Sequence, residues 1–251
     1  MKLITLGTGA GNPSMTRNNS ASYLETAHGG CLIDAGAPVA ASMIRKGIDF
    51  NGIRAVFITH LHEDHFGGLS GFLNNRMRPR VRESSQWRGF WPEVWLPTEE
   101  AITIFKQLMN LERHGVSDDQ IIYRVIRPGL FYDDGYLRVS AIPNLHCIWH
   151  GKILPSYCFV LEAEGKKLVC TGDLSHDCSD FPVKDAADAD IVLCELTHIH
   201  PEVGMKYFKQ IKPGKLVFNH VAERYEKLFP EFLKELDYPA AVAKDGDEFE
   251  L

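Results

Sequence analysis

The sequence predicts an α/β fold in which strands and helices interleave along the whole chain. Short apolar runs, such as residues 2–6 and 166–171, recur between turn residues and are typical of buried strands. Residues 99–112 instead repeat apolar side chains at the spacing of an amphipathic helix, at positions 101, 104, 105, 108 and 111. No repeat or linker-like stretch interrupts the pattern, so we expect a single domain over residues 1–251.

The N-terminal half opens with a strand over residues 2–6 and a glycine-rich turn over 7–13. This turn lacks the dinucleotide-binding pattern, because Asn12 stands where a glycine is needed and no helix is expected after it. The other elements expected here are a hairpin of residues 20–24 and 31–34, helices over 38–46 and 69–73, and a strand over 54–58.

The C-terminal half is richer in strands. A helix is expected over residues 225–235, and the turn 132–135 separates the first two strands of this half. The expected strands are residues 121–126, 137–142, 156–162, 166–171, 190–194 and 215–218, with 248–251 as an edge strand.

Composition and charge argue against several classes of protein. The net charge of −6 disfavours a protein that binds long nucleic acids through a basic surface. The six cysteines show neither metal-site nor disulfide spacing and are interpreted as reduced core thiols. The N-terminus leaves no room for a signal peptide, and no apolar run reaches the length of a membrane span. We therefore expect a cytoplasmic protein without a membrane partner.

The most informative stretch is the histidine-rich segment after the strand at 54–58. In an extended chain alternate side chains point the same way, so His60 and His62 can bind one metal ion. Asp64 and His65 follow where the chain begins to coil, so they are aimed at a neighbouring point and predict a second ion. Imidazole and carboxylate ligands suit zinc first, with manganese or iron as alternatives.

Residues 59–65, Thr-His-Leu-His-Glu-Asp-His, resemble the signature of the metallo-β-lactamase superfamily, whose members are mostly dinuclear metal hydrolases. Residues 6–11, 17–20 and 224–225 are similar to ribonuclease Z and related small phosphodiesterases. The resemblance covers essentially the whole chain. It implies an αββα sandwich of two facing mixed sheets, with helices outside and the metals at one edge.

The resemblance also implies metal ligands later in the chain, each near the end of an expected strand. His146 fits the third motif when counted from the preceding strand, whereas His150 fits when counted back from the following one. We favour His146, with His150 as a neighbour that faces the substrate. Asp173 would bridge both metals, and His220 would complete the ligands of the second.

Asp34 ends its expected strand at the place where this superfamily carries an aspartate beneath the metals. We expect it to orient the ligands through hydrogen bonds rather than to bind metal. The alternative interpretation is a cap for the helix over 38–46, and both roles are compatible.

For the reaction, the resemblance implies a metal-bridged hydroxide that attacks a small phosphodiester. Candidate residues for the reaction are Asp64 and a proton relay of Glu195 with His198 or His200, by likeness to the Glu and His pair of ribonuclease Z. Alternatively, Glu195, His198 and His200 are ordinary polar residues at the surface after a strand and take no part in the reaction. The segment between His146 and Asp173 is too short for the long arm of tRNA-processing enzymes, which argues against a long nucleic acid as a partner.

Two other functions stay open. The same fold also hydrolyses lactones and thioesters, and a metal-binding sensor would need no turnover at all. A ligand set with an open position favours the enzyme, because structural zinc sites are closed.

Residues 74–95 interleave arginines with aromatic residues. The guanidinium group of arginine can bind a phosphate group through two parallel hydrogen bonds, so these arginines favour a small anionic substrate. A lid or a homodimer interface is the other interpretation, and we prefer either to contact with nucleic acid. The residues concerned are Arg76, Arg78, Arg80, Arg82 and Arg88, with Trp87, Phe90, Trp91 and Trp95.

Overall fold

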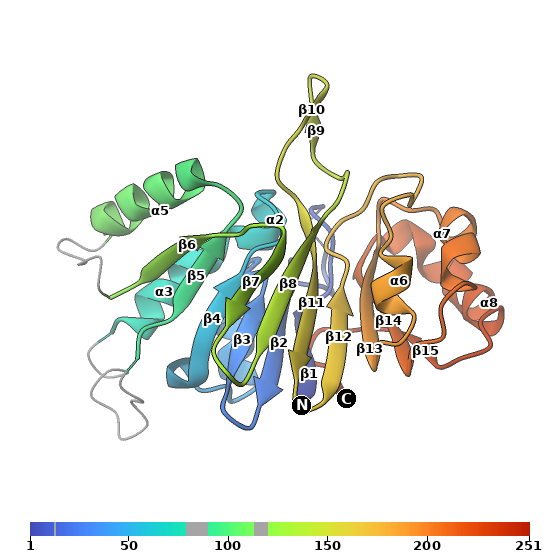
Figure 1. Cartoon of the computed structure of the whole chain (residues 1–251), viewed down its shortest axis with the longest axis horizontal. Coiled ribbons are helices and arrows are strands. Elements are labelled where there is room, and N and C mark those ends of the chain that lie inside the picture. The colour runs from blue at the N-terminus through green and yellow to red at the C-terminus, as the bar shows by residue number, and fades with distance from the viewer. Residues whose placement is uncertain (13, 79–89, 113–119) are drawn as a thin grey trace.

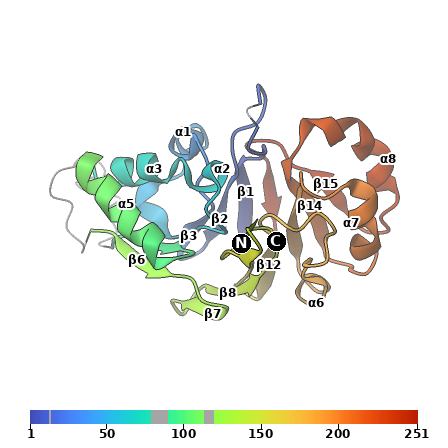
Figure 2. The same ribbon diagram turned by 90° about the horizontal axis from the view of Figure 1, so that it is seen from above.

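The computed structural model contains two facing seven-stranded sheets with helices on their outer sides (Figures 1 and 2). It describes residues 1–12, 14–78, 90–112 and 120–251. The first sheet has the order β16 (Glu248–Glu250), β1 (Lys2–Gly7), β2 (Ala21–Thr26), β3 (Gly29–Ile33), β4 (Ile53–Phe57), β5 (Glu93–Leu96), β6 (Ile122–Val125). The second has the order β15 (Ala240–Val242), β14 (Lys215–Val221), β13 (Ile191–Leu196), β12 (Lys166–Cys170), β11 (Tyr157–Ala163), β8 (Arg138–Pro143), β7 (Gly129–Asp133). The expected αββα sandwich is confirmed.

The helices form the outer layers, as Figure 2 shows. The first sheet packs against α1 (Val39–Arg45), α3 (Leu69–Arg76) and α5 (Glu99–Glu112). The second packs against α6 (Val183–Ala186), α7 (Pro201–Phe208) and α8 (Phe229–Lys234). Three shorter elements are the helix α2 (Glu63–Phe66) and the 3₁₀ helices η1 (Phe50–Gly52) and η2 (Glu223–Leu228).

The central strands are buried on both faces. In β3, Cys31 and Ile33 belong to the core between the sheets, whereas Leu32 belongs to the core under the helices. In β4, Phe57 faces the other sheet and Val56 faces the helices. A strand covered on both faces needs apolar side chains at every position, which explains the continuous apolar runs in the sequence.

The sequence did not predict β5 in the first sheet or β7 and β15 in the second. β7 pairs with β8 at the edge of this sheet, and the turn between them follows Asp133 instead of lying at 132–135. Asp134 fixes the turn, because its Oδ1 accepts hydrogen bonds from the backbone N–H groups of Tyr136 and Leu137.

Two helical predictions also differ in detail. The single helix expected over 225–235 is split into η2 and α8, and Pro230 lies in the first turn of α8, where its missing N–H costs nothing. The boundaries of α5 are as predicted, but its buried face is Ala101, Phe105 and Met109. Ile104 and Leu111, from the predicted apolar positions, are exposed.

Two expectations from composition can be compared with the described part of the chain. No helix there combines the length and the apolar character that crossing a membrane requires. All six cysteines are free thiols, and only Cys147 is not fully buried.

Phe57 tests the packing between the sheets. It is fully buried and its ring lies 5.1 Å from Tyr132, 5.6 Å from Phe131 and 6.3 Å from Phe159, measured between centroids. We expect Phe57→Ala to reduce the free energy of unfolding by about 3–5 kcal/mol, because it leaves a cavity between the sheets. Urea denaturation measures the loss. Ile104→Ala, at an exposed position, is the control and should change stability by less than about 0.5 kcal/mol.

Candidate metal centre

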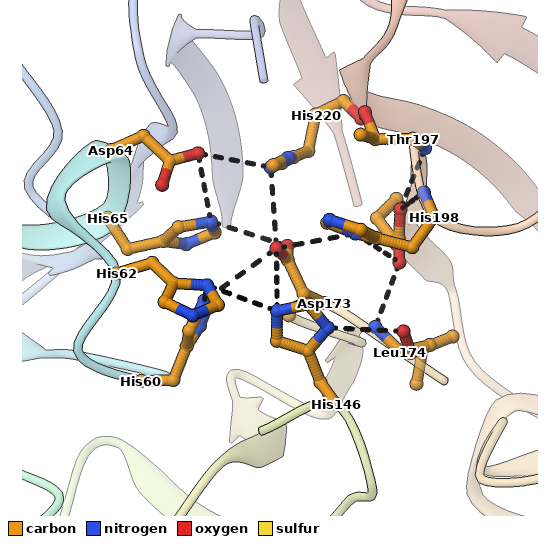
Figure 3. Close-up of polar contacts among 12 residues, drawn as sticks. His60, His62, Asp64, His65, His146, Asp173, Leu174, Thr197, His198 and His220 are labelled. Carbon is orange, nitrogen blue, oxygen red and sulfur yellow. Dashed lines mark hydrogen bonds and ion pairs between the residues drawn. The ribbon is translucent and has the colours of Figure 1, made fainter. Parts of the chain in front are cut away.

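The predicted ligands meet at one edge of the sandwich, where strands of both sheets end (Figures 1 and 3). The segment 59–65 follows β4 of the first sheet, and its last residues form α2. His146 follows β8 and Asp173 follows β12 in the second sheet. His220 lies within β14, one residue before its end, and not beyond the strand as predicted. Its φ of 48° is unusual for a histidine, and such strain is often found at functional sites.

A first set of side chains gathers around His60, His62 and His146. The Nδ1 of His62 lies 3.0 Å from the Nε2 of His60 and 3.2 Å from the Nε2 of His146. An oxygen of Asp173 lies 3.7 Å from the Nε2 of His60 and 3.5 Å from that of His146. The four groups converge as the ligands of one ion must (Figure 3).

A second set gathers around Asp64, His65 and His220. The Nε2 of His220 lies 3.3 Å from Asp64 and 3.4 Å from Asp173. The Nε2 of His65 lies 3.6 Å from Asp64 and 3.3 Å from the other carboxylate oxygen of Asp173. Asp173 thus lies between the two sets, in the position that the sequence analysis assigns to a bridging ligand (Figure 3).

Asp34 orients one histidine of each set. Its Oδ2 lies 2.7 Å from the Nδ1 of His65, and both of its oxygens lie 3.0 Å from the Oγ1 of Thr59. The Thr59 hydroxyl donates to this carboxylate and accepts from the Nδ1 of His60, which is 3.1 Å away. Both imidazoles are therefore held with Nε2 as the free lone pair, aimed at Asp173. The helix-cap alternative for Asp34 is not observed, since Pro38 stands at the cap of α1.

The polar atoms of both sets fit divalent metal ions. The Nε2 atoms of His65 and His220 and the Oδ1 of Asp173 are buried and have no hydrogen-bond partner among the described residues. Burying such atoms without a partner is costly, so several of them at one point call for a shared ligand. Imidazole nitrogens and carboxylate oxygens are the donors that zinc and related ions bind.

The charges of the first set and of Asp173 suit metal binding. Burial, and then the neighbouring His65, keep the pKa of His60 well below its usual value, and burial also lowers the pKa of His62 and His146. Burial opposes ionisation of Asp173, but His220 and His65 hold the pKa of its carboxyl well below its usual value. Neutral imidazoles and an ionised carboxylate are the protonation states that bind metal. In the chain without metal, burial opposes protonation of His65, but Asp173 and Asp34 raise its pKa well above the usual value, so an ion would have to displace a proton there.

Glu195 and His198 lie beside the first set. The buried carboxylate of Glu195 accepts hydrogen bonds from the backbone N–H groups of Leu174, Thr197 and His198, at 2.8, 2.7 and 2.9 Å. Its Oε1 also lies 3.1 Å from the Nδ1 of His198, which in turn is 3.5 Å from Asp173. Burial opposes protonation of His198, but the contact with Glu195 raises its pKa.

His200 and His150 lie outside the cluster. The Nδ1 of His200 accepts the backbone N–H of Glu202 and caps α7, so the structure does not support a relay through His200. Pro201 at the first helical position was the sequence signal for this cap. His150 is exposed at the tip of a hairpin of β9 (Ile148–Trp149) and β10 (Lys152–Ile153), which the sequence analysis did not predict. These extra residues explain why counting back from β11 suggested His150.

Cys147 is near the cluster, which the sequence analysis missed. The nitrogens of His60, His62 and His146 and the Sγ of Cys147 all lie within 4.8 Å of one another. The sequence predicts a core position for all six cysteines. The signal available in the sequence was that Cys147 directly follows the predicted ligand His146.

The structure describes only part of the arginine-rich segment, residues 74–78 and 90–95. Arg76 is fully buried, donates to the carbonyl of Phe90 at 2.7 Å and lies over the ring of Trp91, so it joins α3 to the segment before β5. Its predicted contact with a substrate is wrong. Arg78 is exposed. Arg80, Arg82, Trp87 and Arg88 lie outside the described residues.

Comparisons with known proteins agree with this fold. Residues 1–87 match the family model described as anti-Pycsar protein Apyc1. A protein of Exiguobacterium sp. named ribonuclease Z is 45% identical, and the match covers 99% of both chains. The fold is similar to the metallo-β-lactamase fold protein YhfI of Bacillus subtilis, with a TM-score of 0.81, 16% identity and 100% and 99% of the two chains covered. It is also similar to the short form of human tRNase Z, with a TM-score of 0.76, 24% identity and the same coverage.

The two sets predict two metal ions per chain. We expect elemental analysis of protein purified without chelator to find about two equivalents of transition metal. His146→Ala should reduce this number, because it removes a donor from the first set. His150→Ala is the matched control and should retain both ions. Loss of metal from the His150 variant instead would move the third-motif ligand to the hairpin.

Asp34→Asn tests the orientation of the histidines. Asparagine tolerates the φ of 58° at this position, so the backbone should be unchanged. The loss of the charged acceptor should weaken metal binding by about 10–100-fold, as removal of such supporting groups does. Competition with a chromogenic chelator measures the affinity. Asp237→Asn, which removes an exposed charge paired with Lys212, should have wild-type affinity. An unchanged affinity in Asp34→Asn would contradict the role of Asp34.

Proposed function

The chain belongs to the ribonuclease Z family of metal-dependent hydrolases, and we propose that it hydrolyses small phosphodiesters at a two-metal centre. The observation that carries the proposal is the sharing of Asp173 between the two sets of side chains, with 3.3–3.7 Å between its oxygens and the surrounding imidazole nitrogens. One carboxylate with two oxygens is suited to hold two ions at the separation of about 3.5–4 Å used in two-metal catalysis.

Each ion would have its own ligands from this chain. His60, His62 and His146 would hold one, and Asp64, His65 and His220 the other. When bound, two divalent ions of this kind, zinc first and manganese or iron as alternatives, supply a hydroxide at neutral pH and positive charge for the phosphoryl oxygens.

The remaining groups move and hold protons. The three backbone N–H groups that bind Glu195 fix its carboxylate, and this carboxylate fixes the Nδ1 edge of His198. The Nε2 edge of His198 is then the one available to a substrate. In the proposal His198 gives a proton to the leaving oxygen, and Glu195 keeps its ring in position for that step.

The choice of a small substrate rests on charge. The chain carries a net charge of −6, which does not attract a long polyanion. Within the described residues, the cavity that His62 and His146 line contains no lysine or arginine side chain. A single phosphodiester needs no extended basic surface, because the metal ions themselves neutralise it.

RNA is the second candidate substrate. It is favoured by the name ribonuclease Z of the Exiguobacterium relative. The chemistry at the phosphorus would be the same, and only the groups that bind the rest of the substrate would differ. A homodimer and a cytoplasmic location stay predictions.

The substrate class can be tested with a panel. Zinc- or manganese-loaded protein should hydrolyse bis(p-nitrophenyl) phosphate faster than a lactone, a thioester or a β-lactam, and faster than it cleaves a tRNA precursor. Chelation should abolish the activity and added metal should restore it. Rapid hydrolysis of thioesters or lactones without hydrolysis of phosphodiesters would overturn the proposal, and efficient cleavage of the tRNA precursor alone would favour the second candidate.

His198 and His200 form a matched pair for the proton step. We expect His198→Ala to lower kcat by about 10²–10⁴-fold and to retain both metals, since it removes a proton donor and not a principal ligand. His200→Ala should have nearly wild-type kcat, because this ring caps α7. Steady-state kinetics measure kcat, and elemental analysis of the same preparations measures the metal content. Loss of a metal from His198→Ala would make His198 a ligand instead.

A further inference from the structure

A cavity of about 450 Å³ adjoins the candidate metal centre beneath the β9–β10 hairpin. His62 and His146 line it, so it opens directly onto the first set of ligands. Most of the remaining wall is apolar and comes from Leu61, Ile148, Trp149 and Leu154. Its size lies within the range of about 300–1,000 Å³ that is usual for small-molecule sites.

The apolar wall is exposed to an unusual degree. Trp149 is 66% exposed, and Ile148, Leu154 and Leu61 are 57%, 46% and 38% exposed. The two strands of the hairpin pair only with each other in the described part of the chain, and the hairpin projects from the sandwich at the edge that carries the metal centre (Figure 1). Apolar side chains gathered beside a reactive centre indicate that another apolar group covers them during function.

We propose that this cavity binds a planar ring of the substrate, such as a nucleobase or an aryl group, against the indole of Trp149. The inference rests on the proposed phosphodiesterase function and names the part of the substrate that the metals do not bind. The phosphoryl group lies at the metal centre, and the ring it carries extends under the hairpin. An exposed indole face offers stacking to a ring of any sequence or substituent.

The chemistry of the wall sets the selectivity. Apart from the histidines and Cys147, the hydroxyl of Thr98 and the indole N–H of Trp149 are the polar side-chain groups of the lining among the described residues. A site with so few hydrogen-bonding groups cannot discriminate strongly between bases, because discrimination of that kind needs buried polar partners. The cavity therefore selects a ring over an alkyl or charged group, and accepts purines, pyrimidines and simple aryl groups alike.

A binding experiment separates the ring from the reaction. Phenylphosphonate and methylphosphonate present the same anion to the metals, and neither is a phosphodiester. Titration of the metal-loaded protein should give a roughly tenfold lower Kd for phenylphosphonate, and Trp149→Ala should remove this difference. Equal affinities in the wild type would overturn the inference, whether or not the protein hydrolyses phosphodiesters.

Steady-state kinetics provide a second test of the ring site. With bis(p-nitrophenyl) phosphate, Trp149→Ala should raise KM roughly tenfold with little change in kcat, as loss of uniform binding does, and Trp149→Phe should largely restore KM. Tyr136→Ala, an exposed aromatic residue on the β7–β8 turn, is the control and should leave KM unchanged.

The outcomes separate the two proposals. No hydrolysis by the wild type, together with the expected phosphonate difference, would reject the proposed function and retain the ring site. Hydrolysis with unchanged KM and unchanged phosphonate affinities in Trp149→Ala would reject the ring site alone. A decrease of mass in light scattering on Trp149→Ala, with phosphonate affinities unchanged, would assign the hairpin to a contact with a second copy and also reject the ring site.

Discussion

The carboxylate of Asp173 is the group on which the rest of the centre depends. It is buried at the end of β12, where a lone negative charge would be costly. The neighbouring His65 and His220 offset that cost in the chain alone, and metal ions would do so when bound. Because its two oxygens face different imidazoles, a shift of this one side chain would alter both sets of ligands together.

The two sheets are needed together because each supplies part of the centre. The segment 59–65 follows the first sheet, whereas His146, Asp173 and His220 come from the second. Backbone hydrogen bonds join the sheets at this edge: Tyr157 donates to the carbonyl of Thr59 at 3.1 Å, and Val221 donates to that of Thr8 at 2.9 Å. The packing around Phe57 lies between the same sheets. Stability of the sandwich and geometry of the centre are therefore coupled, and ions that bind only the folded state would strengthen both.

Most strands and the segments that carry the ligands were predictable, because burial on both faces leaves continuous apolar runs and the ligands follow soon after them. The resemblance to ribonuclease Z is confirmed by the 45% identical relative. The β9–β10 hairpin was not predictable, because strands so short leave no periodic signal and its apolar side chains are exposed. The burial of Arg76 depends on the carbonyl of Phe90, a distant partner that no local pattern reveals. The proximity of Cys147 to His60 likewise depends on how two loops meet.

The two-metal centre is tested most directly by anomalous diffraction from crystals of the zinc-loaded protein at the zinc absorption edge. It predicts two peaks about 3.5–4 Å apart, one on each side of the Asp173 carboxylate. One peak should be bound by His60, His62 and His146, and the other by Asp64, His65 and His220. A single peak, or a pair whose ligands do not include Asp173, would contradict the two-metal centre proposed for this chain.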